Sequence, residues 1–264
     1  MNNYKHLKNV LNYNIKKIAE CSSLFCENSA VDFTHNRKLN FETTIKNVIS
    51  METGSLKDEL LKLNDYSVDT PTASAFIQAR SKIRVEAFQI LFDRFNEKTH
   101  KDKLFKGYRL LAIDGSVLPI DNTIYDEETT ELRHGTTAKA YSAYHLNASY
   151  DLLECTYDDL IIQGEAKKNE NDAFCQLVDR YKGKKAIFIA DRNYESYNGF
   201  EHVVQSGNKY LIRVKDIHSK SSITQSLGPF TDDEFDIDVF RMLTLKQNKM
   251  TKACPHLQIC DLTL

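Results

Sequence analysis

Residues 110–120 read LLAIDGSVLPI, an apolar run that stops at a carboxylate, Asp114. A run of this kind predicts a buried strand, and an unpartnered charge at its end is costly to bury. A second stretch, KAIFIADRNY at residues 185–194, repeats the pattern and stops at Asp191. Each aspartate therefore needs a turn, a partner or a metal ion. Taken singly, an aspartate after a strand is more often a turn or cap residue, and Asp-Gly is a common turn sequence.

After residue 105 the period of the chain changes from helical to strand-like. The patterns predict, in order, strands at 108–113, 141–150 and 152–163, a helix at 169–181, a strand at 185–190, a helix at 196–207 and a strand at 209–214. This is the order of a ribonuclease H-like α/β domain, in which three antiparallel strands precede helix–strand units that complete a mixed sheet with flanking helices. In that fold the strands at 108–113 and 185–190 lie side by side and parallel.

The two aspartates would then face each other at one edge of the sheet. α/β folds place their chemistry at the carboxyl ends of strands, and two adjacent carboxylates ionise together cheaply when a cation lies between them. Hard oxygen ligands select Mg²⁺ or Mn²⁺, and a pair of such ions is the usual device for in-line attack on a phosphodiester. Asp114 and Asp191 are therefore the predicted catalytic and metal-binding residues.

The first hundred residues predict an all-α region. Apolar residues recur at helical spacing in five segments, at 7–18, 41–49, 56–61, 71–79 and 85–95, with Asn40 and Ser55 as possible caps. The simplest role for these apolar stripes is a helix–helix core. We therefore expect two domains, a helical DNA-binding region at residues 1–100 and the sheet domain at residues 101–264.

Charge is unevenly distributed along the chain. Residues 1–107 hold 17 Lys and Arg against 13 Asp and Glu, a net of +4, whereas residues 108–264 hold 18 against 24, a net of −6. A basic first part followed by an acidic second part fits a region that binds nucleic acid, attached to a metal-dependent active site. The segment RSKIR, with Arg80, Lys82 and Arg84, is the predicted phosphate contact, although such residues usually decorate a solvated face.

The composition, with 41% hydrophobic and 27% charged residues, is that of a globular protein. No apolar run approaches the roughly 18 residues of a membrane span, and the N-terminus lacks a signal-peptide core, so an intracellular location is expected. The six cysteines are scattered, which predicts free thiols. A structural zinc site in the segment CPHLQIC, with Cys254, His256 and Cys260, is the weaker alternative because a second Cys-x-x-Cys half is missing.

The two aspartate motifs also carry a resemblance. LLAIDGSVLPI and IFIADRNYES resemble the first and second acid motifs of DDE transposases, specifically the bacterial insertion-sequence-four family, which writes these acids as D-G-S and D-R-G-Y. Asn193 stands where that family usually has glycine, and the acid itself is kept. TPTASAFIQARSKI, residues 70–83, resembles the stretch ahead of the family's catalytic domain, and the resemblance extends from about residue 30 onwards.

This resemblance implies a transposase that cuts DNA at the ends of an insertion sequence and joins the freed 3′-hydroxyls to a target by two-metal phosphoryl transfer. Its partners would be double-stranded DNA and a second copy of the chain on that DNA, without membrane contact. Its location would be the bacterial cytoplasm, beside the nucleoid. Arg192 and Tyr194, from D-R-N-Y, would orient the site or contact a DNA strand, and Ser116 would cap a turn after Asp114.

One part of the family pattern is missing. The family's third acid is a glutamate in a Tyr…Arg…Glu…Lys signature on a later helix, but Glu234 is the one glutamate after Glu201 and its surroundings do not predict a helix. We therefore expect a truncated chain that is inactive alone. The alternatives are a non-catalytic DNA-binding or inhibitory transposase remnant, and an unrelated two-metal nuclease or phosphatase. Ser116 disfavours an aspartyl-phosphate phosphatase, which would need a second aspartate two places after Asp114.

Overall fold

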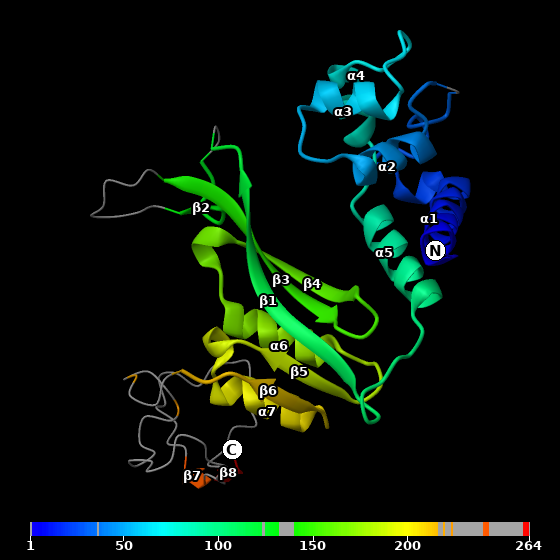
Figure 1. The fold of residues 1–264 in the computed structure, drawn as a ribbon. Helices are drawn as coiled ribbons and strands as arrows, with labels where there is room; N and C mark the ends of the chain where they lie inside the picture. Colours follow the sequence, from blue (N-terminus) through cyan, green and yellow to red (C-terminus); the bar gives the residue numbers. More distant parts are fainter. Residues whose placement is uncertain are drawn as a thin grey trace. The chain divides into compact units, whose positions relative to one another are not determined.

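The computed structural model describes residues 2–35, 37–122, 125–131 and 140–215, with Ser219, Ile223 and a short antiparallel pair, β7 (Phe240–Met242) and β8 (Asp261–Thr263). The chain divides into two compact units, Met1–Lys101 and Asp102–Leu264. The first is helical and the second is built on a sheet (Figure 1). Glu234 and the CPHLQIC segment lie outside the described residues, so neither the third-acid prediction nor the zinc alternative has a structural answer.

The first unit contains the five predicted helices. They are α1 (Asn2–Glu20), α2 (Phe41–Ser50), α3 (Leu56–Leu63), α4 (Ala73–Arg80) and α5 (Glu86–Thr99), with a 3-10 turn, η1 (Ser22–Phe25), after α1. The side chains of Asn40 and Ser55 accept hydrogen bonds from backbone amides in the first turns of α2 and α3, which confirms both as N-caps. None of the described helices is both long and apolar enough to cross a membrane.

The apolar stripes of these helices form the core of the first unit. Its buried members come from α1, α2, α5 and the short segments next to them: Ile15, Ile18, Cys26, Phe41, Ile45, Ile83, Ala87 and Leu91. The stripes therefore have the structural role that their spacing predicts, and the basic residues between them stay at the surface.

The second unit contains a six-stranded mixed sheet. Its strands are β1 (Arg109–Ile120), β2 (Thr130–Glu131), β3 (Tyr141–Asp151), β4 (Thr156–Gly164), β5 (Ala186–Ala190) and β6 (Lys209–Ile212). β3 pairs antiparallel with β1, β2 and β4, whereas β5 pairs parallel with β1 and β6. The parallel neighbours β1 and β5 are those that the sequence predicts. This is the expected ribonuclease H-like fold, with helices preceding the sheet.

Strand β1 is longer than predicted. It does not stop ahead of Asp114 but continues to Ile120, because every residue from Leu111 onwards pairs with β3. The prediction that Ser116 caps a turn is wrong, since Ser116 lies within the strand opposite Leu146. The backbone ladder to β3 outweighs the local turn preference of Asp-Gly-Ser, as tertiary context often does for strand residues.

The start of β1 is held by a buried ion-pair network of Arg109, Asp151 and Asp158. We call this part of the strand, with its ion pairs, the paired end of β1. Arg109 Nε lies 2.8 Å from Asp151 Oδ2, and Arg109 Nη1 lies 2.8 Å from Asp158 Oδ1. The other oxygen of Asp151 accepts hydrogen bonds from the amides of Leu153 and Glu154, both at 2.9 Å. These bonds fix the connection between β3 and β4, so β4 begins at residue 156 rather than at the predicted residue 152.

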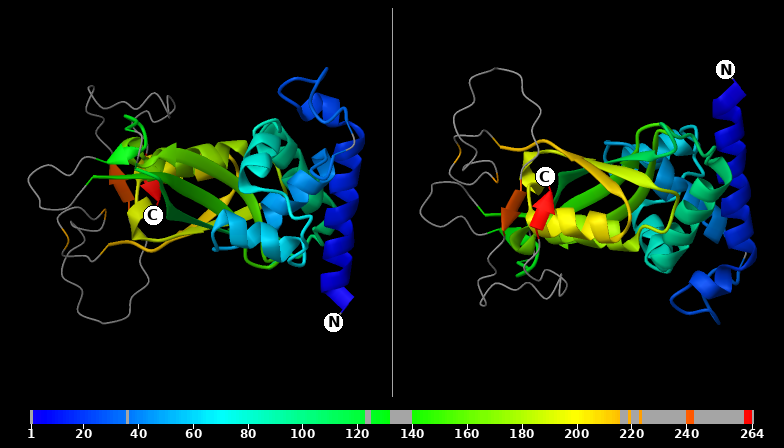
Figure 2. Two further views of the ribbon diagram at one scale, coloured as in Figure 1. Left: turned by 90° about the horizontal axis from the view of Figure 1, so that it is seen from above. Right: turned by 90° about the horizontal axis from the view of Figure 1, so that it is seen from below.

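Helices α6 (Glu170–Arg180) and α7 (Tyr197–Gln205) pack together on one face of the sheet (Figure 2). A 3-10 turn, η2 (Glu165–Lys167), leads from β4 to α6. Gly207 follows α7 with a φ of 71°, the left-handed conformation that its predicted C′ position requires. The chain can then turn directly into β6.

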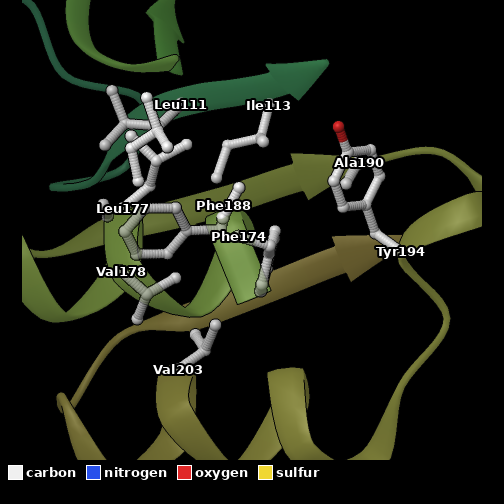
Figure 3. Packing of buried hydrophobic residues seen from close by; sticks show 12 residues of the cluster. Leu111, Ile113, Phe174, Leu177, Val178, Phe188, Ala190, Tyr194 and Val203 are labelled. Atoms are coloured by element: carbon white, nitrogen blue, oxygen red, sulfur yellow. The ribbon is translucent and has the colours of Figure 1, made fainter. Parts of the chain in front are cut away.

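The core of the second unit lies between the sheet and these two helices (Figure 3). Alternate residues of β1 and β5 meet an apolar stripe of α6 and a residue of α7, and the labelled members are Leu111, Ile113, Phe188, Ala190, Phe174, Leu177, Val178, Tyr194 and Val203. Every second residue of the two strands therefore points into this core, and the residues between them point to the other face.

The other face of the sheet is open to solvent in the described part of the chain. Four of its apolar side chains are between 39% and 58% exposed: Leu118, Tyr144, Leu160 and Ile162. Asp114 lies on this open face, because it is one residue beyond the core-facing Ile113. Asp114 therefore faces solvent, while the side chain of the preceding residue, Ile113, packs into the core.

Candidate active site

The parallel ladder between β1 and β5 brings the two predicted acids together. The ladder ends at the pair Ile113 and Ala190, and Asp114 and Asp191 are the next residues on their strands. Adjacent strands lie about 4.8 Å apart, so the two aspartates start from neighbouring backbone positions. The predicted juxtaposition therefore follows from the observed register.

Both carboxylates are exposed and are held by short backbone contacts. Asp114 Oδ1 accepts a hydrogen bond from the amide of Gly115 at 2.8 Å. Asp191 is the N-cap of a 3-10 turn, η3 (Arg192–Tyr194), and its Oδ1 accepts a hydrogen bond from the amide of Asn193 at 2.8 Å. Asp191 thus fills the cap role common for an aspartate after a strand. Each carboxylate keeps a second oxygen that these contacts do not use.

The donor set at this edge suits a hard divalent cation. Mg²⁺ is commonly bound by one or two carboxylates, with waters and substrate phosphates completing its octahedral shell. Among the described residues, no three or more His, Cys, Asp and Glu side chains converge closely enough to hold a metal ion. Asp114 and Asp191 would therefore hold a cation as a pair and leave its other positions to water or phosphate.

The two residues of η3 that the sequence singles out differ in exposure. Arg192 is exposed, whereas Tyr194 is 1% exposed and lies in the core cluster. Burial raises the pKa of the Tyr194 hydroxyl, and the negative charges of Glu170, Asp114 and Asp191 raise it further. The Tyr194 hydroxyl therefore stays neutral, and all three carboxylates affect its pKa. Of these two residues, the exposed Arg192 is the one that can reach a DNA strand.

The sequence patterns do not predict a buried polar cluster under β1. His145, on β3, lies between two carboxylates: its Nδ1 is 3.0 Å from Glu165 Oε2, and its Nε2 is 3.1 Å from Glu170 Oε1. Lys168 Nζ lies 2.6 Å from Glu165 Oε1. The available signal was a histidine at a core-facing position of a strand, two residues after the fully buried Ala143.

Glu165 is the fixed charge of this cluster. Burial by itself would raise the pKa of its carboxyl, but hydrogen bonds from Lys168, His145 and Tyr141 outweigh burial and lower the pKa below its ordinary value of 4.5. The Glu165 carboxylate is therefore ionised at neutral pH and orients the His145 ring.

In the first unit, the predicted phosphate contacts are partly occupied by carboxylates. Lys82 lies 3.5 Å from Asp32, and Arg84 lies 3.0 Å from Glu86. Arg80 is exposed and forms no ion pair among the described residues. The Arg84–Glu86 pair is exposed on both sides, and such pairs are worth about 0–1 kcal/mol, so a phosphate can displace its carboxylate. The Asp32 side chain is only 9% exposed, so Lys82 is held more firmly.

A cavity of about 660 Å³ lies beside this segment in the first unit. Its lining combines basic side chains with an apolar floor: Val31, Phe33, His35, Arg37, Lys38, Leu39, Pro71, Ala75, Gln78, Ala79 and Lys82. Lys38 also pairs with Asp69 at 2.5 Å. Three basic side chains of the helical unit thus line one hollow: Arg37, Lys38 and Lys82.

The family described as transposase DDE domain matches residues 105–252, more than half of the 264-residue chain. The match includes both aspartates and begins just ahead of β1. No curated protein matches the chain. DDE transposases act on DNA and generally use divalent metal ions, which agrees with the paired carboxylates and sets aside the alternative of an unrelated nuclease or phosphatase. The chain belongs to the DDE transposase family.

Proposed function

We propose that this chain acts on the DNA ends of an insertion sequence by phosphoryl transfer, with Asp114 and Asp191 as the ligands of Mg²⁺ or Mn²⁺. The observation that carries the proposal is the register of β1 and β5, which makes the two aspartates neighbours at the end of the parallel ladder. Their D-G-S and D-R-N-Y contexts favour the insertion-sequence-four group within the family.

The bound cations would activate the attacking water or 3′-hydroxyl and stabilise the leaving oxygen. The protein's own contribution is to hold Asp114 and Asp191 at fixed positions, through the strand ladder on one side and the η3 cap on the other. The exposed guanidinium of Arg192 follows Asp191 directly and suits a phosphate of the bound strand. Tyr194 orients this turn from within the core.

The cation sites are tested by titrating the full chain with Mn²⁺ and following its thermal unfolding. At a hundredfold excess of ligand over Kd, binding stabilises a protein by about 2.7 kcal/mol, and we expect Asp114→Asn or Asp191→Asn to remove most of this gain. Asp172→Asn, which also converts an aspartate of the second unit, is the matched control. Unchanged Mn²⁺ stabilisation in both site variants would overturn the assignment.

We propose further that the first unit grips double-stranded DNA through phosphates, in an assembly of two copies of the chain on DNA. The support is its net positive charge together with the basic hollow that includes Lys82. Arg80→Ala should weaken the binding of the full chain to DNA at low salt and reduce the slope of log K against log salt by about 1. Arg94→Ala, an exposed arginine on α5, is the control. Salt-independent binding would contradict a phosphate grip.

Cutting by this chain alone is expected to be undetectable. No Tyr…Arg…Glu…Lys set occurs after Val214, and losing one such electrostatic element typically lowers a rate by on the order of 10²–10³. The assay compares strand cleavage of the element's ends by the wild-type chain and by Asp114→Ala, with Mg²⁺ and with Mn²⁺. Metal-dependent cutting that disappears in the variant would show that the chain supplies a third ligand from elsewhere.

A further inference from the structure

The proposed cation site lies where two strands separate. β1 pairs with β5 up to Ile113, and beyond this point β3 is its one partner among the described strands, while the chain after Ala190 turns into η3. Within the described residues, the edge of β1 that faced β5 has no pairing strand from Asp114 onwards. The buried Tyr194 hydroxyl lies close enough to this gap for the charges of Asp114, Asp191 and Glu170 all to raise its pKa.

Glu170 approaches the gap from the helix-covered face. It is the first residue of α6, and its side chain keeps 28% of its surface exposed. A Cβ placed on Gly115 would lie 3.3 Å from Glu170 Oε1 and 2.7 Å from His145 Nε2. The glycine next to Asp114 therefore lets these two side chains pack directly against the backbone of β1.

Glu170 lies against the buried cluster. His145 Nε2 lies 3.1 Å from its carboxylate, and the opposite ring nitrogen is fixed by the ionised Glu165. The helix N-terminus of α6 also favours a negative charge at Glu170. The Glu170 carboxylate therefore lies next to β1, beside Gly115 and His145.

The Tyr194 hydroxyl is a second and independent sign of a ligand. The residue is 1% exposed, and its hydroxyl has no hydrogen-bond partner within the described part of the chain. Figure 3 shows the ring beside Ala190 with the hydroxyl pointing toward the β1 side of the sheet. Leaving a buried hydroxyl without a partner is unfavourable, so this position favours an ordered water or a ligand.

We propose that Glu170 and the Tyr194 hydroxyl bind the hydration shell of the divalent cation held by Asp114 and Asp191. This inference rests on the proposed function, and it adds a carboxylate from α6 that the two acid motifs do not contain. Glu170 is here a positioning residue that acts through water, because no three acidic side chains converge directly in the described residues. Mg²⁺ and Mn²⁺ keep several waters when two carboxylates bind them, so outer-shell groups have waters to hold.

The test is Mn²⁺ binding to the full chain, measured by calorimetric titration together with the water-proton relaxation of bound Mn²⁺. Removing an outer-shell partner typically costs 10–100-fold in metal affinity, so we expect roughly that loss in Glu170→Gln and a smaller loss in Tyr194→Phe. Asp172→Asn lies in the same first turn of α6 and removes the same charge, and it should leave the affinity within about twofold. Thermal unfolding without metal shows whether each variant is folded.

The outcomes separate this inference from the proposed function. Loss of binding in Asp114→Asn with unchanged affinity in Glu170→Gln would overturn the role of Glu170 and leave the aspartate pair standing. Full binding in Asp114→Asn would overturn both. An equal loss of Mn²⁺ affinity in Glu170→Gln and Asp172→Asn would mean that any negative charge at the N-terminus of α6 has the same effect. This outcome would also overturn the proposal.

Discussion

Charged side chains are arranged in opposite ways at the two ends of β1: they are paired at one end and unpaired, among the described residues, at the other. At the paired end, Arg109 meets Asp151 and Asp158, and burial alone would lower the pKa of Arg109, but the charge of Asp158 and the hydrogen bonds to both aspartates raise it. Around Asp114 and Asp191 the pattern is reversed, because two exposed carboxylates lie side by side with no ion pair among the described residues.

This difference separates an ion-pair network that is complete in itself from the site that is proposed to bind a cation. Every charge at the paired end of β1 has an opposite charge within hydrogen-bond distance, so the network is complete without a ligand. The Asp114 end keeps carboxylate oxygens that the backbone contacts do not use, and a buried hydroxyl that finds no partner among the described residues. The exposed carboxylates are hydrated when no ligand is bound, and a bound cation would use the oxygens that the backbone contacts leave over.

Asp151→Asn is expected to give the largest effect. The substitution leaves Arg109 without its most buried partner, and breaking one side of a buried ion pair typically costs about 3–5 kcal/mol. Urea unfolding of the full chain measures the change in the free energy of unfolding. Asp158→Asn is the matched control, because Asp158 pairs with the same arginine but is 22% exposed, and it should cost less. Equal costs would break the comparison.

When no metal is present, Asp114→Asn should change the free energy of unfolding in the opposite direction and stabilise the chain. Removing one of two like charges relieves their repulsion, so we expect the free energy of unfolding to rise by about 0.2–1 kcal/mol in buffer with a chelator. The same urea unfolding experiment gives the value, and raising the salt concentration should shrink it. A loss of stability would mean that Asp114 has a structural partner, and the contrast between the two ends would fail.

Glu165→Gln tests the charge that orients the cluster next to Asp114. The pKa of Glu165 is lowered in the folded chain, so its contribution to stability is present above about pH 4.5 and is lost as pH falls through the lower, folded value. The variant should therefore be less stable than the wild type at neutral pH, and this difference should vanish in acid. Unfolding midpoints between pH 3 and pH 7 measure it, with Glu127→Gln, an exposed glutamate of the same unit, as control.

The sequence was sufficient for the helices, for the order of the main strands and for the neighbouring positions of the two acids. Periodicity located the five helices of the first unit, and the caps Asn40 and Ser55 followed from their side-chain chemistry. The parallel neighbours β1 and β5 followed from the order of strands and helices, which restricts an α/β sheet to few topologies.

What the sequence could not give depends on contacts between distant residues. β1 continues through Asp114 because β3 supplies a ladder, and no local pattern in D-G-S contains that information. Likewise, Gly115 read as a turn residue, yet its role is to admit His145 and Glu170 against the strand. Glu170 itself looked like an ordinary acidic residue in the first turn of a helix.

The parallel pairing of β1 with β5 also has a consequence for the order of folding. The antiparallel strands β1, β3 and β4 follow one another along the chain, whereas the register that unites Asp114 with Asp191 joins segments separated by β3, β4 and α6. Contacts of such long separation form slowly, because the intervening chain must lose its freedom before the pairing stabilises it. The acidic site should therefore be assembled late, and an early intermediate that already holds the antiparallel strands would bind no metal. A newly made chain would bring Asp114 beside Asp191 only when its last parallel strands have docked.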